Sequence, residues 1–496
     1  MKSVRMGCLM TINPAELFLQ RAHEVPFKAA IIDENITMSF RDVAHIVLSI
    51  ADNMRSRGIG QGAIVAVHTN DSLVIICSTF ACALLGASWV FGDDALANNR
   101  DIVPSHRLYT REVKSEGFEP SAMLVDEYWF KPKSENFWSS GSVFPGFSSS
   151  NDCWLFFHSS GTTGTPKFMK LTCETQLKRI LALNTEFVAG ESRCVFLFSA
   201  PSPPSLMRSL AALCWGGGLV ISTDPHFWSE SNTTHVFASP QQIKYVMSGH
   251  SLSKKIGKAL IGGDGLPDEL SKSLLENFHR VVNTYGSTET NLVVENEKLL
   301  NSDGSVTSRT IWYDSEIQIV DEDDRPLPAG EEGIVRIRND YTVEGYVGVE
   351  PTRQSATRQG WFYPGDTGYV SEDRNFFVSG RHNDRLIVGG VKINAVLLDY
   401  VISSVDGVED SITFQLEHTG GEHELIAFIK IREDAIHSDV QSDAKIKIAA
   451  SLGISAIPSK FIFTNEIPRT ENGKPNRRAC AQLAMQARRE RGINFI

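Results

Sequence analysis

The sequence predicts an α/β protein of more than one domain, with a large N-terminal part of parallel and mixed sheets covered by helices. At 496 residues the chain is too long for one ordinary core. Strand-like and helical patterns alternate through its first half, as they do in parallel sheets with helical crossovers. Between about 311 and 380 the pattern changes to short strands, predicted at 316–320 and 333–338 around a turn at 321–328, which indicates a small β-subdomain.

The elements of the first half follow from their apolar patterns. The predicted order is a strand at 64–68, a helix at 72–85, a strand at 89–91, a strand at 195–198, a helix through 206–214, a glycine run and a strand at 219–221. A helix that ends at glycine before a short β-branched strand is typical of parallel units. The uncharged stretch Val74–Phe91 just reaches the length of a membrane span. Because small polar residues interrupt it and acidic residues bound it, we predict a buried helix and no stable membrane insertion.

Composition and charge exclude several classes of function. A net charge of −11 argues against nucleic acid or an anionic membrane surface as a partner, since both are bound by basic faces. The eight cysteines form no C-x-x-C pair and no His cluster accompanies them, so neither a zinc site nor a redox motif is indicated. We expect reduced, mostly buried thiols in a cytoplasmic protein.

The most informative motif follows an apolar strand at 155–158. Residues 159–167 read SSGTTGTPK, in which small residues let backbone N–H groups approach an anion while hydroxyls and a lysine add donors. The motif therefore suits a polyphosphate. It is not a Walker loop, because Pro166 stands where that loop requires Gly and Phe168 where it requires Ser or Thr. The alternative, a flexible Ser/Thr/Gly turn, would not ordinarily end in Pro–Lys directly after a strand.

This loop resembles the signature of the acyl-adenylate-forming superfamily of acyl-CoA ligases, carrier-protein adenylation domains and luciferases. Four more blocks are similar to that family's motifs and stand in its order: VVNTYGSTE at 281–289, GWFYPGD at 360–366, GRHND at 380–384 and PRTENGK at 468–474. The resemblance extends over almost the whole chain. It implies an N-terminal AMP-binding domain at 1–381, which includes the β-subdomain, and a small mobile α+β C-terminal domain at 382–496 that carries a catalytic lysine.

The resemblance also implies a two-step reaction. A carboxylic acid and ATP give acyl-AMP and pyrophosphate, with Mg²⁺ as the metal, and a nucleophile then displaces AMP. In the family the C-terminal domain rotates between the steps. Asn383 stands at the hinge position, where Asp or Lys is usual, and Asn tolerates the unusual backbone angles that a hinge needs.

The implied nucleotide site draws on several of these blocks. Its phosphate-binding residues would be Ser160, Thr162, Thr163 and Lys167, which together neutralise the leaving pyrophosphate. The residues around adenine and the acyl group would be Gly262, Gly263, Asn283, Tyr285 and Gly286. Asn283 would meet the exocyclic amine and Tyr285 would stack on the base, although an aromatic residue after Asn, taken alone, is more often part of a core. Asp366 would accept from the ribose hydroxyls, unless it only forms an Asx turn, and Arg381 would bind ribose or phosphate.

Three residues would carry the chemistry. Thr288 would hydrogen-bond the α-phosphate, and Glu289 is a hard oxygen ligand for Mg²⁺, with capping of a following helix as its alternative role. Lys474 would bridge the carboxylate and the α-phosphate, because negative charge builds on both reactants in the transition state. A lone surface lysine is ordinarily only solvated, but this one lies within P-R-T-x-x-G-K.

The acid itself is left open. Residues 199–205 occupy the place where many relatives carry an aromatic or histidine gate to the acyl pocket, and neither is present. No Asp between Phe198 and Trp215 could pair with an ammonium group, which disfavours a charged α-amino acid. Aromatic, alicyclic and aliphatic acids all stay possible.

The acceptor is inferred from one turn. Gly389 and Gly390 resemble the glycine turn that lines the pantetheine channel of thioester-forming members, where a thin arm must pass close to the backbone; a plain β-turn is the alternative. CoA is the favoured acceptor, and a separate carrier-protein pantetheine or an amine are the alternatives. A non-catalytic nucleotide-binding relative would have lost Glu289 or Lys474, and an interaction scaffold would show repeats or apolar stripes, so both classes are disfavoured.

Overall fold

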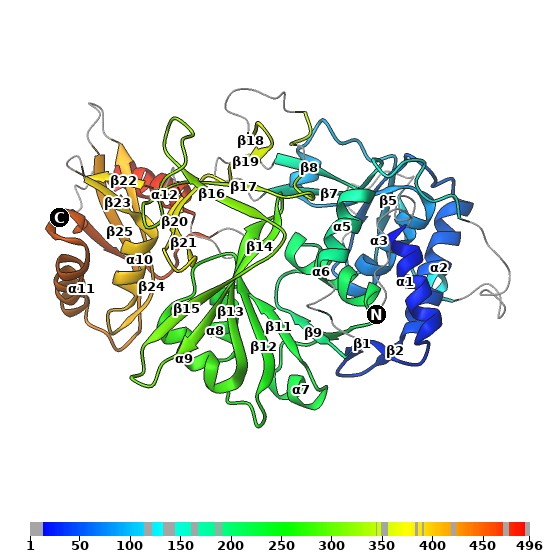
Figure 1. The fold of residues 1–496 in the computed structure, drawn as a ribbon, viewed down its shortest axis with the longest axis horizontal. Coiled ribbons are helices and arrows are strands. Elements are labelled where there is room, and N and C mark those ends of the chain that lie inside the picture. Colours follow the sequence, from blue (N-terminus) through cyan, green and yellow to red (C-terminus); the bar gives the residue numbers. More distant parts are fainter. Residues whose placement is uncertain are drawn as a thin grey trace. The chain divides into compact units, whose positions relative to one another are not determined.

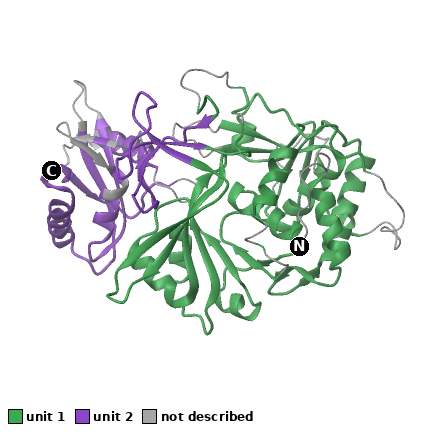
Figure 2. Cartoon of the chain, viewed as in Figure 1, with its two compact units in different colours: residues 1–316, 338–360 green, residues 317–337, 361–496 purple. Residues whose placement is uncertain are grey.

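In the computed structural model, the described residues are 13–113, 122–131, 144–159, 167–183, 187, 191–343, 345–348, 356–381, 385–388, 391–417, 423–469 and 476–491. The chain divides into two compact units, shown in Figure 2: unit 1 comprises residues 1–316 and 338–360, and unit 2 comprises residues 317–337 and 361–496. This division follows the packing of the chain. The domain boundary between Arg381 and His382 stays a prediction.

A nine-stranded sheet forms the centre of unit 1. Its order is β15 (Val306–Trp312), β14 (Asn291–Leu300), β13 (Phe278–Ser287), β12 (Ile256–Gly262), β11 (His235–Ala238), β9 (Arg193–Phe196), β10 (Gly218–Ile221), β1 (Ala29–Asp33) and β2 (Thr37–Ser39). The six central strands of this order, from β13 through β12, β11, β9 and β10 to β1, are parallel to their neighbours. Strand β2 at one edge and strands β14 and β15 at the other pair in the antiparallel sense. Figure 1 shows this sheet with α8 (Pro240–Val246) and α9 (Asp268–Asn277) beside β12 and β13.

A second sheet of unit 1 has six strands. Its order is β6 (Met123–Leu124), β5 (His106–Tyr109), β3 (Ile64–His68), β4 (Ser88–Phe91), β7 (Cys153–Ser159) and β8 (Lys167–Thr172), parallel except for the β7–β8 pair. The remaining elements of unit 1 are α1 (Pro14–Glu24), α2 (Phe40–Ser56), α3 (Ser72–Leu85), α4 (Asp94–Ala97), η2 (Glu127–Phe130), α5 (Cys173–Ala182), α6 (Pro203–Cys214), α7 (Pro225–Glu230) and β18 (Thr357–Arg358).

The core of unit 1 explains why the predicted apolar helix forms. Helix α3 begins at the Asp71 N-cap, ends at Gly86 in the left-handed conformation, and is buried from Val74 onward. Phe80 on this helix stacks on Phe18 of α1 with ring centroids 4.6 Å apart. A buried helix is what the uncharged stretch predicted, and no helix of the described residues is long and apolar enough to cross a membrane.

Unit 2 combines a small β-structure with an α+β part. The first contains β16 (Glu316–Val320), β17 (Gly333–Arg338), β19 (Trp361–Phe362), β20 (Asp366–Val370) and β21 (Phe376–Arg381), and β17 pairs with β16, β19 and β20. The second contains β22 (Arg385–Val388), β23 (Val391–Asn394), α10 (Ala395–Ser403), β24 (Val408–Glu417), β25 (His423–Ile431), α11 (His437–Leu452), η5 (Ile454–Ala456), β26 (Lys460–Phe463) and α12 (Arg477–Arg491).

Several predictions are confirmed to the residue. The strands at 64–68, 316–320 and 333–338 and the helix at 72–85 have the expected bounds, and the mixed α/β class is correct. All seven described cysteines are free thiols, and six of them are buried. Burial raises the pKa of the partly buried Cys153 thiol to about 12, so it stays protonated at neutral pH.

The nine-stranded sheet also buries an ion pair. Lys258 on β12 donates to both carboxylate oxygens of Glu295 on β14, at 3.0 and 2.8 Å, and the two side chains are only 8% and 1% exposed. Replacing one partner of such a pair leaves the other charge buried and uncompensated.

We predict that Lys258→Met destabilises unit 1 by about 3–5 kcal/mol, because it removes the ammonium group that pairs with the buried Glu295 carboxylate. The double variant Lys258→Met/Glu295→Leu should recover most of this loss, since it removes both charges. Urea unfolding, monitored by tryptophan fluorescence, measures the free energy of unfolding of the single and the double variant. Equal destabilisation in the single and double variants would show that the ion pair is not the source of the effect.

Candidate active site

The predicted glycines Gly262 and Gly263 and the 281–289 block meet at one edge of the nine-stranded sheet. Strands β12 and β13 are parallel, and Gly262, the last residue of β12, pairs in register with Thr284 of β13. Ligands of open α/β sheets bind outside the carboxyl ends of parallel strands. Asn283 and Tyr285 lie at this end of β13, so the predicted adenine-binding residues are brought together there.

Close packing explains one of the predicted glycines at this edge, and a positive φ explains the other. A Cβ atom at Gly262 would lie 2.4 Å from the Thr284 hydroxyl, and Gly263 has a φ of +91°. Asn283 donates from Nδ2 to the backbone oxygens of Asp264 (2.9 Å) and Ile261 (3.3 Å). Because these bonds use its amide nitrogen, the Asn283 side chain presents Oδ1 as an acceptor, which is what an exocyclic amine needs.

A tight turn joins β13 to β14 and contains Thr288 and Glu289. At Gly286 a Cβ atom would lie 2.0 Å from the backbone oxygen of Asn291, so the hairpin admits only glycine there. Asn291, at the start of β14, has a φ of +59°. The alternative role of Glu289 as the cap of a following helix is wrong, because a ten-residue strand follows it.

Tyr346 connects Glu289 to the predicted phosphate-binding lysine. Glu289 is 7% exposed, and its Oε1 accepts a hydrogen bond of 2.7 Å from the Tyr346 hydroxyl. The Lys167 ammonium lies 5.5 Å from the centroid of the same ring. Tyr346 also forms a β-bridge with Met169 of β8. Lys167 and Glu289, which are far apart in the sequence, therefore both contact one aromatic residue.

Arg179 is a site residue that sequence reasoning missed. It lies on α5, is 1% exposed, and donates to the backbone oxygens of Thr288 (3.1 Å) and Glu289 (2.8 Å). Burial lowers its pKa to about 10, partly offset by the Glu289 carboxylate, so the guanidinium is charged at neutral pH. A buried cation therefore lies directly against the turn that carries two predicted catalytic residues.

Asp366 and Arg381 form a pair within unit 2. They face each other in register on β20 and β21, and Arg381 Nε lies 3.1 Å from Asp366 Oδ1. Arg381 also donates to the backbone oxygen of Pro364. The carboxylate is thus held at the start of β20.

Several predicted residues lie outside the described residues. They are Ser160, Thr162, Thr163, Asn383, Gly389, Gly390 and Lys474. The residues that flank the first of these stretches are described. Ser159, at the end of β7, pairs with Lys167, at the start of β8.

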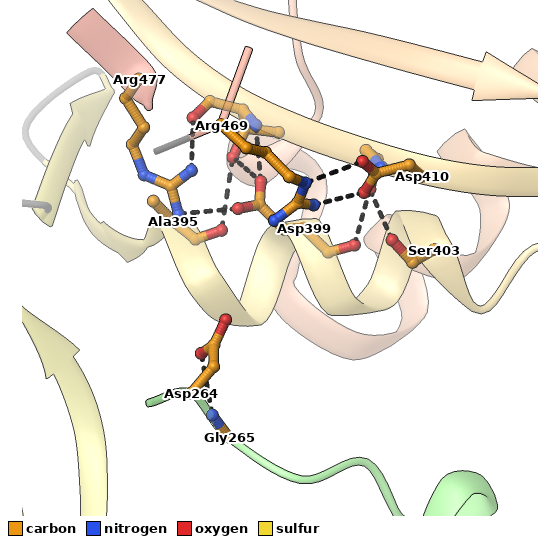
Figure 3. A network of polar contacts seen from close by, with 10 residues as sticks. Asp264, Gly265, Ala395, Asp399, Ser403, Asp410, Arg469 and Arg477 are labelled. Atoms are coloured by element: carbon orange, nitrogen blue, oxygen red, sulfur yellow. Dashed lines mark hydrogen bonds and ion pairs between the residues drawn. The ribbon is translucent and has the colours of Figure 1, made fainter. Parts of the chain in front are cut away.

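The residues on either side of the Lys474 stretch are attached to α10 and β24, as Figure 3 shows. Arg469 donates to Asp410, with Nε 3.0 Å from Oδ2. Arg477 forms an ion pair of 2.7 Å with Asp399 and donates to the Thr413 backbone oxygen at 3.2 Å. Both ends of the segment that contains Lys474 are therefore anchored to the same part of unit 2.

Among the described residues, no group of three or more His, Cys, Asp or Glu side chains could hold a metal ion. One buried carboxylate, Glu289, fits a magnesium ion that takes most of its ligands from phosphates and water.

The chain is similar in sequence to known proteins. A family model described as "AMP-binding enzyme" matches residues 18–101 and 106–347, more than half of the chain. The D-alanine–D-alanyl carrier protein ligase of Bacillus velezensis is 26% identical over 358 residues, which are 67% of this chain and 71% of that protein. The first curated relatives are far longer, and the chain spans only about a tenth of their length, between 8% and 11%.

Two solved structures show the same fold. O-succinylbenzoate CoA synthetase (MenE) from Bacillus subtilis, in complex with ATP and a magnesium ion, aligns with a TM-score of 0.80 at 19% identity and covers 93% of this chain and 98% of its own. The amide bond synthetase McbA from Marinactinospora thermotolerans aligns with a TM-score of 0.75 at 16% identity and covers 95% and 100%.

We predict that Gly286→Ala destabilises the β13–β14 hairpin by at least about 1–3 kcal/mol, because its Cβ would overlap the backbone of Asn291. Gly60→Ala is the matched control, since nothing lies within 4 Å of a Cβ there. The thermal midpoints of the two variants decide the matter. A Gly286→Ala protein as stable as the control would mean that the hairpin tolerates a different turn.

Proposed function

Because the chain belongs to the AMP-binding enzyme family, within the acyl-adenylate-forming superfamily, we propose that it joins a carboxylic acid to AMP from ATP and then transfers the acyl group to a thiol. The observation that carries this proposal is the arrangement of Lys167, Tyr346 and Glu289 beside the adenine-side residues of β13. Lys167 on β8 and Glu289 in the turn after β13 both contact Tyr346, which supports assigning a cation for phosphate, a carboxylate for Mg²⁺ and an acceptor for adenine to one site.

The proposed nucleotide site assigns each group a physical role. Lys167, with the hydroxyls of Ser160, Thr162 and Thr163, neutralises the β- and γ-phosphates. Glu289 ligates Mg²⁺, which when bound reduces the negative charge on the phosphates. Thr288 donates to the α-phosphate, where the bond to pyrophosphate breaks. Asn283 Oδ1 accepts from the exocyclic amine, and the ring of Tyr285 supports the base.

The proposed catalytic residue is Lys474. An acid carboxylate that attacks the α-phosphate brings two anions together, and an ammonium group between them stabilises the transition state more than the ground state. Asp366 is proposed to bind the ribose, and Arg381 the ribose or a phosphate. We retain the division into a domain at 1–381 and a C-terminal domain at 382–496 that rotates after adenylation, with Asn383 at the hinge.

The acceptor is the finer part of the proposal. CoA is favoured because Gly389 and Gly390 suit a pantetheine channel and because one structural neighbour is a CoA synthetase. A carrier-protein pantetheine is the second candidate, since one relative is a carrier protein ligase. An amine is the third, since one neighbour is an amide bond synthetase. Buried free cysteines and the need for ATP favour a cytoplasmic location.

Acid-dependent exchange of labelled pyrophosphate into ATP, measured over a panel of aromatic, alicyclic and aliphatic acids, tests the adenylation step. We predict that Lys474→Ala reduces this exchange by about 10²–10⁴-fold while ATP still binds, because the lysine acts mainly in the transition state. The second step, started from synthetic acyl-AMP, should change much less. Exchange at the wild-type rate in the variant would remove Lys474 from the mechanism, and wild-type protein that binds ATP without exchange would indicate a non-catalytic relative.

A separate prediction tests the acceptor. If Gly389 and Gly390 border a pantetheine channel, Gly390→Leu should block thioester formation while pyrophosphate exchange stays near the wild-type rate. If the glycines only form a turn that needs a positive φ, the substitution should cost about 1–3 kcal/mol and damage both steps together. Undiminished CoA-dependent turnover in the variant would contradict the channel. A wild-type enzyme that never consumes CoA would point to a carrier protein or an amine.

A further inference from the structure

Arg179 uses all five of its N–H groups inside unit 1. Nε and Nη2 both donate to the backbone oxygen of Tyr341, at 3.1 and 2.9 Å. Nη2 also donates to Glu289 O at 2.8 Å, and Nη1 donates to Thr288 O at 3.1 Å and to Met207 Sδ at 3.4 Å. Its four acceptors in the described part of the chain are therefore three carbonyl oxygens and a thioether, and none of them is a carboxylate.

These bonds join the catalytic turn to a second segment. Val343 N donates to Glu289 O at 3.0 Å, so the same carbonyl accepts from Arg179 and from the segment that begins at Tyr341. Asn339 Nδ2 donates to Thr290 O at 3.1 Å, which adds a further link between the two segments. Thr288 and Glu289 are thus fixed through their backbone oxygens, independently of what their side chains bind.

Hydrogen bonding to backbone oxygens does not by itself explain why the buried residue at position 179 is charged. Burying a cation without an anionic partner costs several kcal/mol, and a neutral amide could have donated to two of the same carbonyls. The Glu289 carboxylate is the acidic group whose charge stabilises the guanidinium most. A fixed charge in a buried setting acts over a longer distance than it would in water, and the turn next to it is where the α-phosphate and its metal are proposed to bind.

We propose that Arg179 is a positioning residue of the adenylation site, which holds the backbone of Thr288 and Glu289 and places a permanent positive charge behind them. This inference rests on the proposed function. Its two parts are separable: the hydrogen bonds set the geometry of the turn, and the charge favours the negative charge that develops at the α-phosphate.

Three variants test the inference. Arg179→Gln removes the charge and most of the donors, Arg179→Lys keeps the charge with fewer donors in reach, and Met207→Leu is the control that removes only the thioether acceptor. For Arg179→Gln we expect kcat for pyrophosphate exchange at saturating ATP and acid to fall by about 10–10²-fold, with a several-fold rise in the Mg²⁺ concentration needed for half-maximal rate and little change in KM for the acid. Arg179→Lys should recover part of kcat, and Met207→Leu should resemble the wild type.

A cycle with Glu289→Gln separates positioning from general stability. If Arg179 acts through this turn, Arg179→Gln should cost much less in the Glu289→Gln background than in the wild type. If Arg179 had only a structural role, Arg179→Gln would lower the melting temperature, leave kcat per folded molecule unchanged and show no coupling with Glu289→Gln. That result would overturn the inference. So would failure of both Arg179 variants to fold.

Different results would contradict the proposed function and the role of Arg179. If the wild-type protein shows no pyrophosphate exchange with any acid of the panel, the proposed function is contradicted, whatever the Arg179 variants do. Wild-type exchange together with an Arg179→Gln kcat within about twofold of it contradicts the inference alone.

Discussion

A buried guanidinium donates hydrogen bonds to the backbone of the turn after β13, which carries two of the predicted catalytic residues. Buried backbone oxygens need donors. In this turn Thr288 O and Glu289 O accept from Arg179, Glu289 O also accepts from Val343 N, and Thr290 O accepts from the Asn339 side chain. Tyr346 on that segment then reaches the Glu289 carboxylate. The position of one carboxylate is thus set by groups from α5, from the turn itself and from the residues after β17.

Local sequence patterns were enough to predict helix α3 and strands β16 and β17. Helix α3 was predictable because an uncharged apolar run between an Asp cap and a Gly stop has few alternatives. Strands β16 and β17 were predictable because turn residues mark both of their ends. The glycines at Gly262, Gly263 and Gly286 were assigned by resemblance, and the structure supplies their reason: two meet neighbouring atoms and one has a positive φ.

Long-range contacts were not predictable. Arg179 lies 162 residues from Tyr341 in the sequence, and one arginine on an amphipathic helix gives no signal of a buried partner. Nothing in the sequence around Tyr346 indicated its contact with Glu289 either. A helix after Glu289 was conceivable because Asn291–Leu300 begins with an apolar run, which periodicity alone does not assign to helix or strand. The pairs Arg469–Asp410 and Arg477–Asp399 are also contacts between distant segments, separated by 59 residues in the first case.

The position of β17 has a consequence for evolution by exchange of gene segments. Residues 317–337 belong to unit 2 although the segments before and after them belong to unit 1, and β17 pairs with β19 and β20 from the later part of the chain. A recombination junction after Gly360 would combine the β17 of one parent with the β20 of another. A junction after Arg381 would transfer no strand of that sheet, so functional hybrids between relatives should accumulate there rather than at the earlier boundary.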